Sequence, residues 1–146
     1  MPRAQHSSPS SSPAIAQVDI VSIHVPLNHE TKHLIDTEEL RLVKVGAILI
    51  NTSRGGVVNE PALLDALRSG HLAGAALDVF EDEPMPPGHP VLNMADVVVS
   101  GHVAAFSRLA AHRTLNAVAD ALIDASNGRL PKGCVNPDAF DEMRPR

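Results

Sequence analysis

The stretch AILINTSRGGVVNEPALLDALRSGHLAGAALDVF, residues 47–80, decides the fold of this chain. It opens with an apolar run at residues 47–51, which we predict to be a strand buried on both faces. A helix is predicted over residues 59–69, with Asn59 as its N-cap and a glycine after its last turn. Residues 73–80 are apolar and small, and we predict a further strand there. A strand, a helix and a strand in this order indicate a parallel βαβ unit.

The same alternation continues on both sides of this unit. Residues 19–24 are predicted to form a strand, and residues 37–43 a short helix with Thr37 as its N-cap. Further along, residues 96–100 are predicted to form a strand and residues 107–126 a long helix with an apolar stripe. Strands that alternate with helices in this way predict an α/β fold around a parallel sheet.

The composition is that of an ordinary globular chain of 146 residues, with 44% hydrophobic and 20% charged residues. The net charge of −5 argues against a nucleic-acid partner, and the apolar runs are too short to predict a membrane span. The single cysteine, Cys134, excludes an internal disulfide framework and fits a reducing compartment, so we predict a cytoplasmic location. His29 and His33 have helical spacing but no evident third ligand, and we predict no metal site.

The ends of the chain differ in kind from its middle. Residues 1–17 are rich in serine and proline and lack periodicity, so we predict a disordered leader. Residues 138–146 are polar and are predicted to form a flexible tail. Residues 18–137 then form the single folded domain.

Polar residues follow the predicted strands at their carboxyl ends, where parallel sheets bind ligands. The guanidinium of Arg54 matches a carboxylate, and a pair formed by Glu83 and His102 suits general acid–base catalysis. Together they suggest chemistry at a carbon next to a carboxylate, such as interconversion of 2-hydroxy and 2-oxo acids. Asp78 could accept a hydrogen bond from a nicotinamide amide or cap a strand end. The alternatives are a surface arginine, a solvated acidic loop and a structural histidine.

Three stretches carry a family resemblance: VDIVSIHVPLNHETKHLID, GAILINTSRGGVVNEPALLDALRSGHLAGAALDVFEDEP and GHVAAFS. They resemble the NAD-binding domain of the D-isomer-specific 2-hydroxyacid dehydrogenases, over about residues 18–137. The closing GRLPKGCVNP is similar to the branch with the C-terminal-binding proteins, glyoxylate/hydroxypyruvate reductases and phosphoglycerate dehydrogenases. The resemblance implies a Rossmann-like doubly wound parallel sheet, NAD as cofactor, and hydride transfer from NADH to the carbonyl carbon of a 2-oxo acid.

The resemblance also implies roles for particular residues. Arg54 would bind the substrate carboxylate and help to polarise the 2-oxo group, and His102 would give the proton to that oxygen. Glu83 would hold His102 and favour its protonated form. Cofactor contacts are implied at seven positions: Val25, Pro26, Thr52, Ser53, Asp78, Ala104 and Ala105.

The chain departs from the family pattern in several places. Asn59 replaces the usual aspartate and Gly101 the usual proline, and neither change removes chemistry. The larger departure is that no G-x-G-x-x-G turn occurs, so we expect the chain to lack the Gly-rich first βαβ half, with its phosphate-binding turn, and the substrate domain. The strand at residues 19–24 would then have an exposed edge.

Three hypotheses follow for the chain. The first is an NAD-dependent oxidoreductase by family, with weak or no activity when alone. The second is an inactive remnant or interaction module that pairs through the sheet edge. The third is one half of a split enzyme. We therefore expect a homo-oligomer or a complementing chain as partner, besides a small 2-hydroxy or 2-oxo acid substrate.

Overall fold

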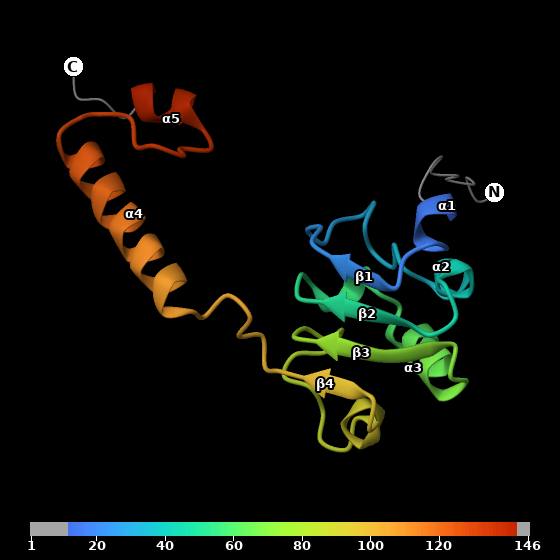
Figure 1. Cartoon of the computed structure of the whole chain (residues 1–146). Helices are drawn as coiled ribbons and strands as arrows, with labels where there is room; N and C mark the ends of the chain where they lie inside the picture. The colour runs from blue at the N-terminus through green and yellow to red at the C-terminus, as the bar shows by residue number, and fades with distance from the viewer. Residues whose placement is uncertain (1–11, 143–146) are drawn as a thin grey trace. The chain divides into compact units, whose positions relative to one another are not determined.

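A computed structural model describes residues 12–142 of the chain, and Figure 1 shows its elements. The chain divides into two compact units, Met1–Ala104 and Ala105–Arg146. The predicted domain of residues 18–137 extends across this division. All of the residues discussed below as a site, except Ala105, belong to the first unit.

The first unit is built on a four-stranded parallel sheet with the order β1-β2-β3-β4. The strands are β1 (Ile20–Ile23), β2 (Ala47–Asn51), β3 (Leu72–Leu77) and β4 (Val97–Val99). The α/β class and the parallel sheet are thus confirmed. The bounds of β2 are those predicted from its apolar run, whereas β3 ends at Leu77, before the predicted end at residue 80.

Helices connect the strands on one side of the sheet (Figure 1). They are α2 (Thr37–Leu42) and α3 (Glu60–Arg68), and the connections also contain the short 3₁₀ turns η1 (Gly55–Val57) and η2 (Pro90–Asn93). A further short helix, α1 (Ser12–Ile15), precedes β1. Asn59 caps α3 as predicted, because its side chain accepts a hydrogen bond from the Ala62 N–H. Thr37 does not cap α2. Asp36 does so, in a reciprocal box with Glu39.

The two chain ends contain more helix than the sequence predicts. The disorder predicted through residue 17 is wrong for α1, whose Ile15 packs against the apolar core. The predicted flexible tail is wrong at its start, where α5 (Pro137–Glu142) forms a helix. Residues 16–17 form a turn, and residues 1–11 and 143–146 of these two predictions lie outside the described residues.

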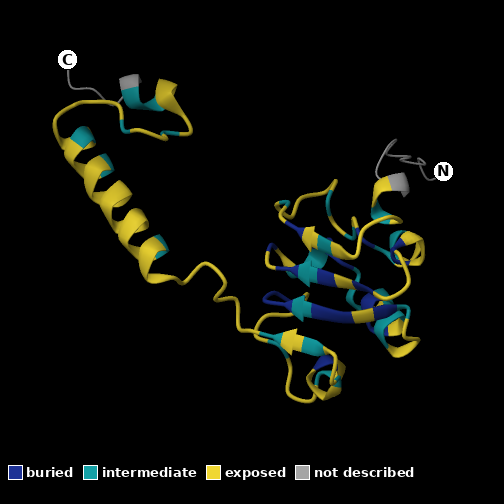
Figure 2. Ribbon diagram, viewed as in Figure 1, coloured by how far each residue is buried: buried dark blue, intermediate teal, exposed yellow. Residues whose placement is uncertain are grey.

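The core lies between the helices and one face of the sheet (Figure 2). Leu49 of β2 and Leu63 of α3 are fully buried there, whereas Ile48 is 41% exposed and Val98 is 70% exposed. The prediction that β2 is buried on both faces is therefore wrong. Right-handed crossovers between strands that follow chain order bring successive helices to the same face. Within the described residues of the first unit, the other face of the sheet has no such cover.

The second unit contains α4 (Arg108–Ser126) and α5. Ser107 caps α4 by accepting a hydrogen bond from the Ala110 N–H, so the predicted helix is confirmed. No residue of α4 is buried, and its apolar stripe is exposed, with Leu115 at 69% and Leu122 at 67%. Among the described helices, none is long and apolar enough to cross a membrane.

Candidate active site

The candidate site lies at the carboxyl ends of the strands, which meet at one edge of a parallel sheet. Arg54 follows β2, Glu83 follows β3 and His102 follows β4. The strand ends are held side by side, because Asn51 of β2 pairs with Leu77 of β3, and Leu77 pairs with Val99 of β4.

Glu83 and His102 form a direct hydrogen bond, with 2.8 Å between His102 Nδ1 and Glu83 Oε2. The other carboxylate oxygen of Glu83 accepts a hydrogen bond from the Phe80 N–H at 3.0 Å. An ionised carboxylate only accepts, so Nδ1 of His102 carries the hydrogen and Nε2 is left for another partner. Both side chains line a cavity of about 460 Å³. The structure therefore brings together the acid–base pair that the sequence predicts.

The electrostatics of Glu83 favour its ionised form. The hydrogen bond from His102 lowers the pKa of the Glu83 carboxyl, and the Phe80 N–H and the charge of Arg54 act in the same direction. Partial burial opposes this shift but does not cancel it. Glu83 is therefore an anion beside the imidazole of His102, which is the arrangement that stabilises a positive charge on the ring.

Asp78 anchors the loop that carries His102. Its carboxylate accepts hydrogen bonds from the Ser100 hydroxyl and from the backbone N–H groups of Val103 and Ala104, both at 2.9 Å. Its backbone carbonyl accepts the His102 N–H at 2.7 Å. His102 has a φ of +59°, a left-handed conformation that costs free energy for a residue other than glycine. These four hydrogen bonds hold it there.

The predicted hydrogen bond from a nicotinamide amide to Asp78 would compete with hydrogen bonds that Asp78 accepts inside the chain. Asp78 is only 3% exposed, and both of its carboxylate oxygens are already engaged. The structure therefore gives Asp78 the strand-end role that is its alternative interpretation. Burial raises the pKa of the Asp78 carboxyl, but the hydrogen bonds from Ser100, Ala104 and Val103 outweigh it and leave the pKa lowered.

The lowered pKa of Asp78 predicts a loss of stability in acid. A carboxyl whose folded pKa lies below its unfolded value of about 3.9 stabilises the fold above that pH. This stabilisation is lost as the pH falls through the folded pKa. Asp78→Asn is expected to lower the free energy of unfolding at neutral pH by about 2 kcal/mol and to flatten its decline in acid. Urea unfolding at several pH values measures both effects.

Asp65→Asn is the matched control for this prediction. Asp65 lies on α3, its side chain is 79% exposed, and it contacts only Arg68 among the ion pairs of the described chain. Its variant is expected to keep the wild-type pH profile. An acid decline in Asp78→Asn as steep as in the wild type would contradict the role assigned to Asp78.

Arg54 lies beside Glu83 and is exposed. Its Nη1 donates a hydrogen bond to the carbonyl oxygen of Ser53 at 2.6 Å. Among the described residues, its other N–H groups donate no hydrogen bond, so they can bind a ligand. Arg54 and Glu83 both line a second cavity of about 400 Å³, together with Lys32 and His33. Glu83 lines both cavities, so it links the predicted carboxylate-binding residue to the predicted proton donor.

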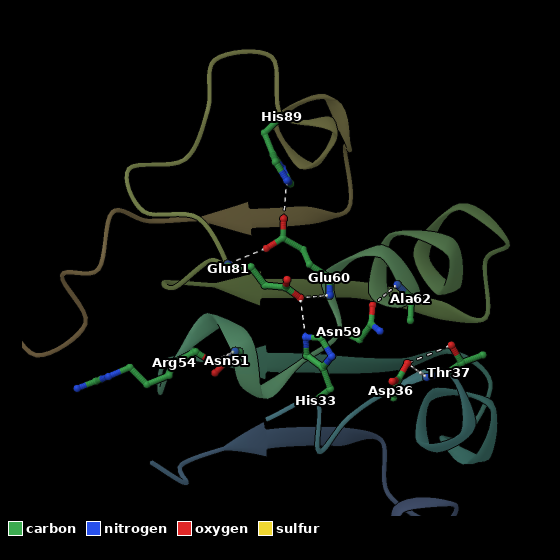
Figure 3. Close-up of polar contacts among 10 residues, drawn as sticks. All are labelled: His33, Asp36, Thr37, Asn51, Arg54, Asn59, Glu60, Ala62, Glu81 and His89. Atoms are coloured by element: carbon green, nitrogen blue, oxygen red, sulfur yellow. Dashed lines mark hydrogen bonds and ion pairs between the residues drawn. The ribbon is translucent and has the colours of Figure 1, made fainter. Parts of the chain in front are cut away.

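Asn51 is a residue of this site that the sequence reasoning missed. It is 1% exposed, and its Nδ2 donates to the Arg54 carbonyl oxygen at 2.9 Å (Figure 3). Its Oδ1 accepts from both the N–H and the hydroxyl of Ser53. Asn51 thereby shapes the turn that presents Arg54. The available signal was an amide side chain on the core-facing side of an otherwise apolar strand.

The remaining predicted cofactor contacts occupy strand ends and the loop after β4. Ile23 of β1 pairs with Asn51 of β2, so the segments that follow them start side by side. Pro26 and Thr52 are exposed, Val25 is half-buried against the core, and Ser53 is buried with its hydroxyl on Asn51. Ala104 donates its N–H to Asp78, and Ala105 begins the second unit. Among the described residues, no group of three or more His, Cys, Asp or Glu could hold a metal ion.

Sequence comparison identifies the family to which this geometry belongs. The sequence model described as "D-isomer specific 2-hydroxyacid dehydrogenase, NAD binding domain" matches residues 3–104. The chain belongs to this family. The match ends where the first unit ends, and it includes most of the segment predicted to be a leader.

One relative and two solved structures agree with this assignment. A glyoxylate reductase from Thermofilum pendens is 49% identical over 127 residues, which is 87% of this chain and 37% of that protein. The TT0316 protein from Thermus thermophilus superposes with a TM-score of 0.80 at 40% identity, over 85% of this chain and 40% of that one. D-lactate dehydrogenase from Lactobacillus jensenii, solved with NAD⁺, superposes with a TM-score of 0.78 at 27% identity, over 84% of this chain and 41% of that one.

The resemblance seen in the sequence is thus confirmed, and so is the Rossmann-like fold. The chain spans less than half the length of each of these three proteins.

Proposed function

We propose that this chain carries the catalytic residues of an NAD-dependent 2-hydroxyacid oxidoreductase, which reduces a small 2-oxo acid to the 2-hydroxy acid. The hydrogen bond between His102 and Glu83 at the ends of the strands carries the proposal. Family membership supports the reaction class, and the similarity to the glyoxylate reductase of Thermofilum pendens favours glyoxylate as the substrate to test first.

Each of the three residues has a separate task in this proposal. The guanidinium of Arg54 binds the substrate carboxylate through two parallel hydrogen bonds. His102, protonated on both ring nitrogens, donates the Nε2 proton to the carbonyl oxygen as that oxygen gains negative charge. Glu83 stays ionised and stabilises the imidazolium, because its pKa is lowered. His102 then recovers a proton from solvent.

NADH, when bound, supplies the hydride to the carbonyl carbon. The residues proposed to hold its nicotinamide end are Val25, Pro26, Thr52, Ser53 and Ala104, and Asp78 supports this site through the hydrogen bond that it accepts from the Ala104 N–H. The exposed Pro26 and Thr52 at neighbouring strand ends fit this task, since they leave the sheet edge open to a planar ring. No G-x-G-x-x-G turn occurs in the sequence, so the pyrophosphate is not assigned to residues of this chain.

A partner chain is the second part of the proposal. β1 is an edge strand whose Ile20 is 56% exposed, and such an edge can pair with a further strand. The partner is either a second copy or a complementing chain that carries the Gly-rich half. Light scattering at micromolar concentration is expected to show association, and a clean monomer would count against a homo-oligomer. The cytoplasmic location stays a prediction from cysteine usage.

An NADH titration followed by fluorescence tests the cofactor part. The chain has no Trp and no Tyr, so its own emission adds little background. Weak saturable binding is expected, followed by slow glyoxylate-dependent oxidation of NADH that increases when a polypeptide with the Gly-rich half is added. No binding by a chain that still melts cooperatively, with or without that polypeptide, would overturn the proposal.

A further inference from the structure

A set of four side chains from four segments lies next to Glu83, and two of them, Glu60 and His89, do not line the cavity that contains Arg54 and Glu83. The set runs from His33 through Glu81 and Glu60 to His89 (Figure 3). These residues come from the loop before α2, the segment after β3, the first turn of α3 and the loop before η2.

Glu60 and Glu81 exchange hydrogen bonds. The Glu60 N–H donates to Glu81 Oε1 at 2.9 Å, and the Glu81 N–H donates to Glu60 Oε2 at 3.0 Å. Glu81 thus satisfies an N–H group in the first turn of α3, where a negative charge is also favourable. In return, Glu60 fixes the backbone of Glu81. We call these two residues the Glu60–Glu81 pair.

His89 completes this arrangement from the other side of Glu60. Its Nδ1 accepts a hydrogen bond from the Val91 N–H at 3.3 Å, so the ring hydrogen is on Nε2, which contacts Glu60 Oε1. The side chains of His89 and Glu60 are only 14% and 15% exposed. At the opposite end, His33 Nε2 lies 3.3 Å from Glu81 Oε1 as an ion-pair contact without hydrogen-bond geometry.

The Glu60–Glu81 pair acts on the segment that holds Glu83. That segment begins at Phe80, whose N–H is bound by Glu83 itself, and Glu81 follows, whose N–H is bound by Glu60. A Cβ added at Gly55 would lie 1.9 Å from the Phe80 carbonyl group, so η1 packs directly against the same peptide. The backbone at Phe80 and Glu81 is therefore held from two sides. This restricts the position from which the Glu83 carboxylate reaches His102.

We propose that Glu60 and His89 are positioning residues, which hold Glu81 so that Glu83, two residues further on, is aligned with Nδ1 of His102. This inference rests on the proposed function, because it assigns Glu60 and His89 to the same His–Glu unit. Neither residue touches the reacting atoms. Their effect reaches the site only through the direction and strength of the hydrogen bond between Glu83 and His102.

The test reads the ring of His102 directly by ¹⁵N NMR of the full chain, well above neutral pH. A hydrogen bond to Glu83 favours the Nδ1–H tautomer, so the ratio of Nδ1–H to Nε2–H reports alignment. Glu60→Gln keeps the shape but offers one carbonyl oxygen to two donors, the Glu81 N–H and His89 Nε2–H. This change is expected to lower the ratio about threefold. His89→Gln, a milder change, is expected to lower it less.

Two further variants make the result decisive. Glu38→Gln is the matched control, because Glu38 lies on α2, is 78% exposed and pairs only with Arg41 among the ion pairs of the described residues. It should leave the ratio unchanged. Glu83→Ala removes the acceptor itself and should abolish the preference for Nδ1–H.

The outcomes separate the two proposals. If Glu83→Ala changes the ratio while Glu60→Gln and His89→Gln lower only the melting temperature, the Glu60–Glu81 pair is merely structural and the inference is wrong. If Glu83→Ala leaves the ratio unchanged, the His–Glu unit of the proposed function fails as well. Should Glu60→Gln not fold, the ratio in His89→Gln decides.

Discussion

Arg54→Ala is expected to lower the rate of NADH-dependent glyoxylate reduction about a thousandfold, the largest effect on activity of any single change in this chain. The guanidinium is the group placed to bind the substrate carboxylate, and its removal leaves that charge unpaired in the transition state. Arg54→Lys is expected to restore only a small part of the rate, because an ammonium cannot form two parallel hydrogen bonds. The loss of NADH absorbance measures each rate.

The measurement uses whichever preparation turns over, the chain alone or the chain with a polypeptide that carries the Gly-rich half. Arg68→Ala is the matched control, because Arg68 lies on α3, is 54% exposed and pairs with Asp65. Its rate should equal that of the wild type. Circular dichroism should show both alanine variants folded. Turnover that survives Arg54→Ala unchanged would refute the assignment of Arg54.

Gly55→Ala is expected to cause the largest loss of stability. An added Cβ would lie 1.9 Å from both the carbonyl carbon and the carbonyl oxygen of Phe80, and 2.6 Å from the Glu81 nitrogen. These are backbone atoms, so one of two packed segments must move. We expect the free energy of unfolding to fall by about 3 kcal/mol. The melting temperature, followed by circular dichroism, should drop by more than about 10 °C.

The neighbouring glycine supplies the control for this experiment. A Cβ at Gly56 would meet only the side chain of Leu27, at 3.3 Å, and that side chain can rotate away. Gly56→Ala should therefore melt close to the wild-type temperature. Equal melting temperatures for the two variants would show that the contact between η1 and the Phe80 peptide is not tight. The same contact makes Gly55→Ala a disturbance of the segment that carries Glu83.

Much of the fold could be predicted from local patterns. The run at β2 is apolar, rich in branched side chains and bounded by Gly46 and Thr52, and its predicted bounds are confirmed. The cap of α2 could not be decided from residue type, because Asp36 and Thr37 are both good caps and stand side by side. Nor does an apolar run reveal whether one face or two are covered. The cover of β2 depends on helices that the described residues of the first unit supply to one face only.

The candidate site likewise has features that could be predicted from the sequence and features that could not. The pairing of Glu83 with His102 could be predicted because both follow strands of one parallel sheet, whose carboxyl ends meet. Asn51 and the Glu60–Glu81 pair could not, because their partners are backbone groups placed by loop conformation. His33 shows the difficulty well. Its contact with Glu81 depends on a left-handed backbone, with a φ of +52°, that nothing in the sequence around it requires.

The strand order of the sheet has a consequence for how the chain is made. Each strand pairs with the one that precedes it, from β1 to β4, and no later strand must insert between two earlier ones. A chain that leaves the ribosome from its N-terminus can therefore add each strand to an edge that already exists. The closing step is β4, which brings His102 to Glu83. The proposed catalytic pair would thus be completed last, after the rest of the sheet has assembled.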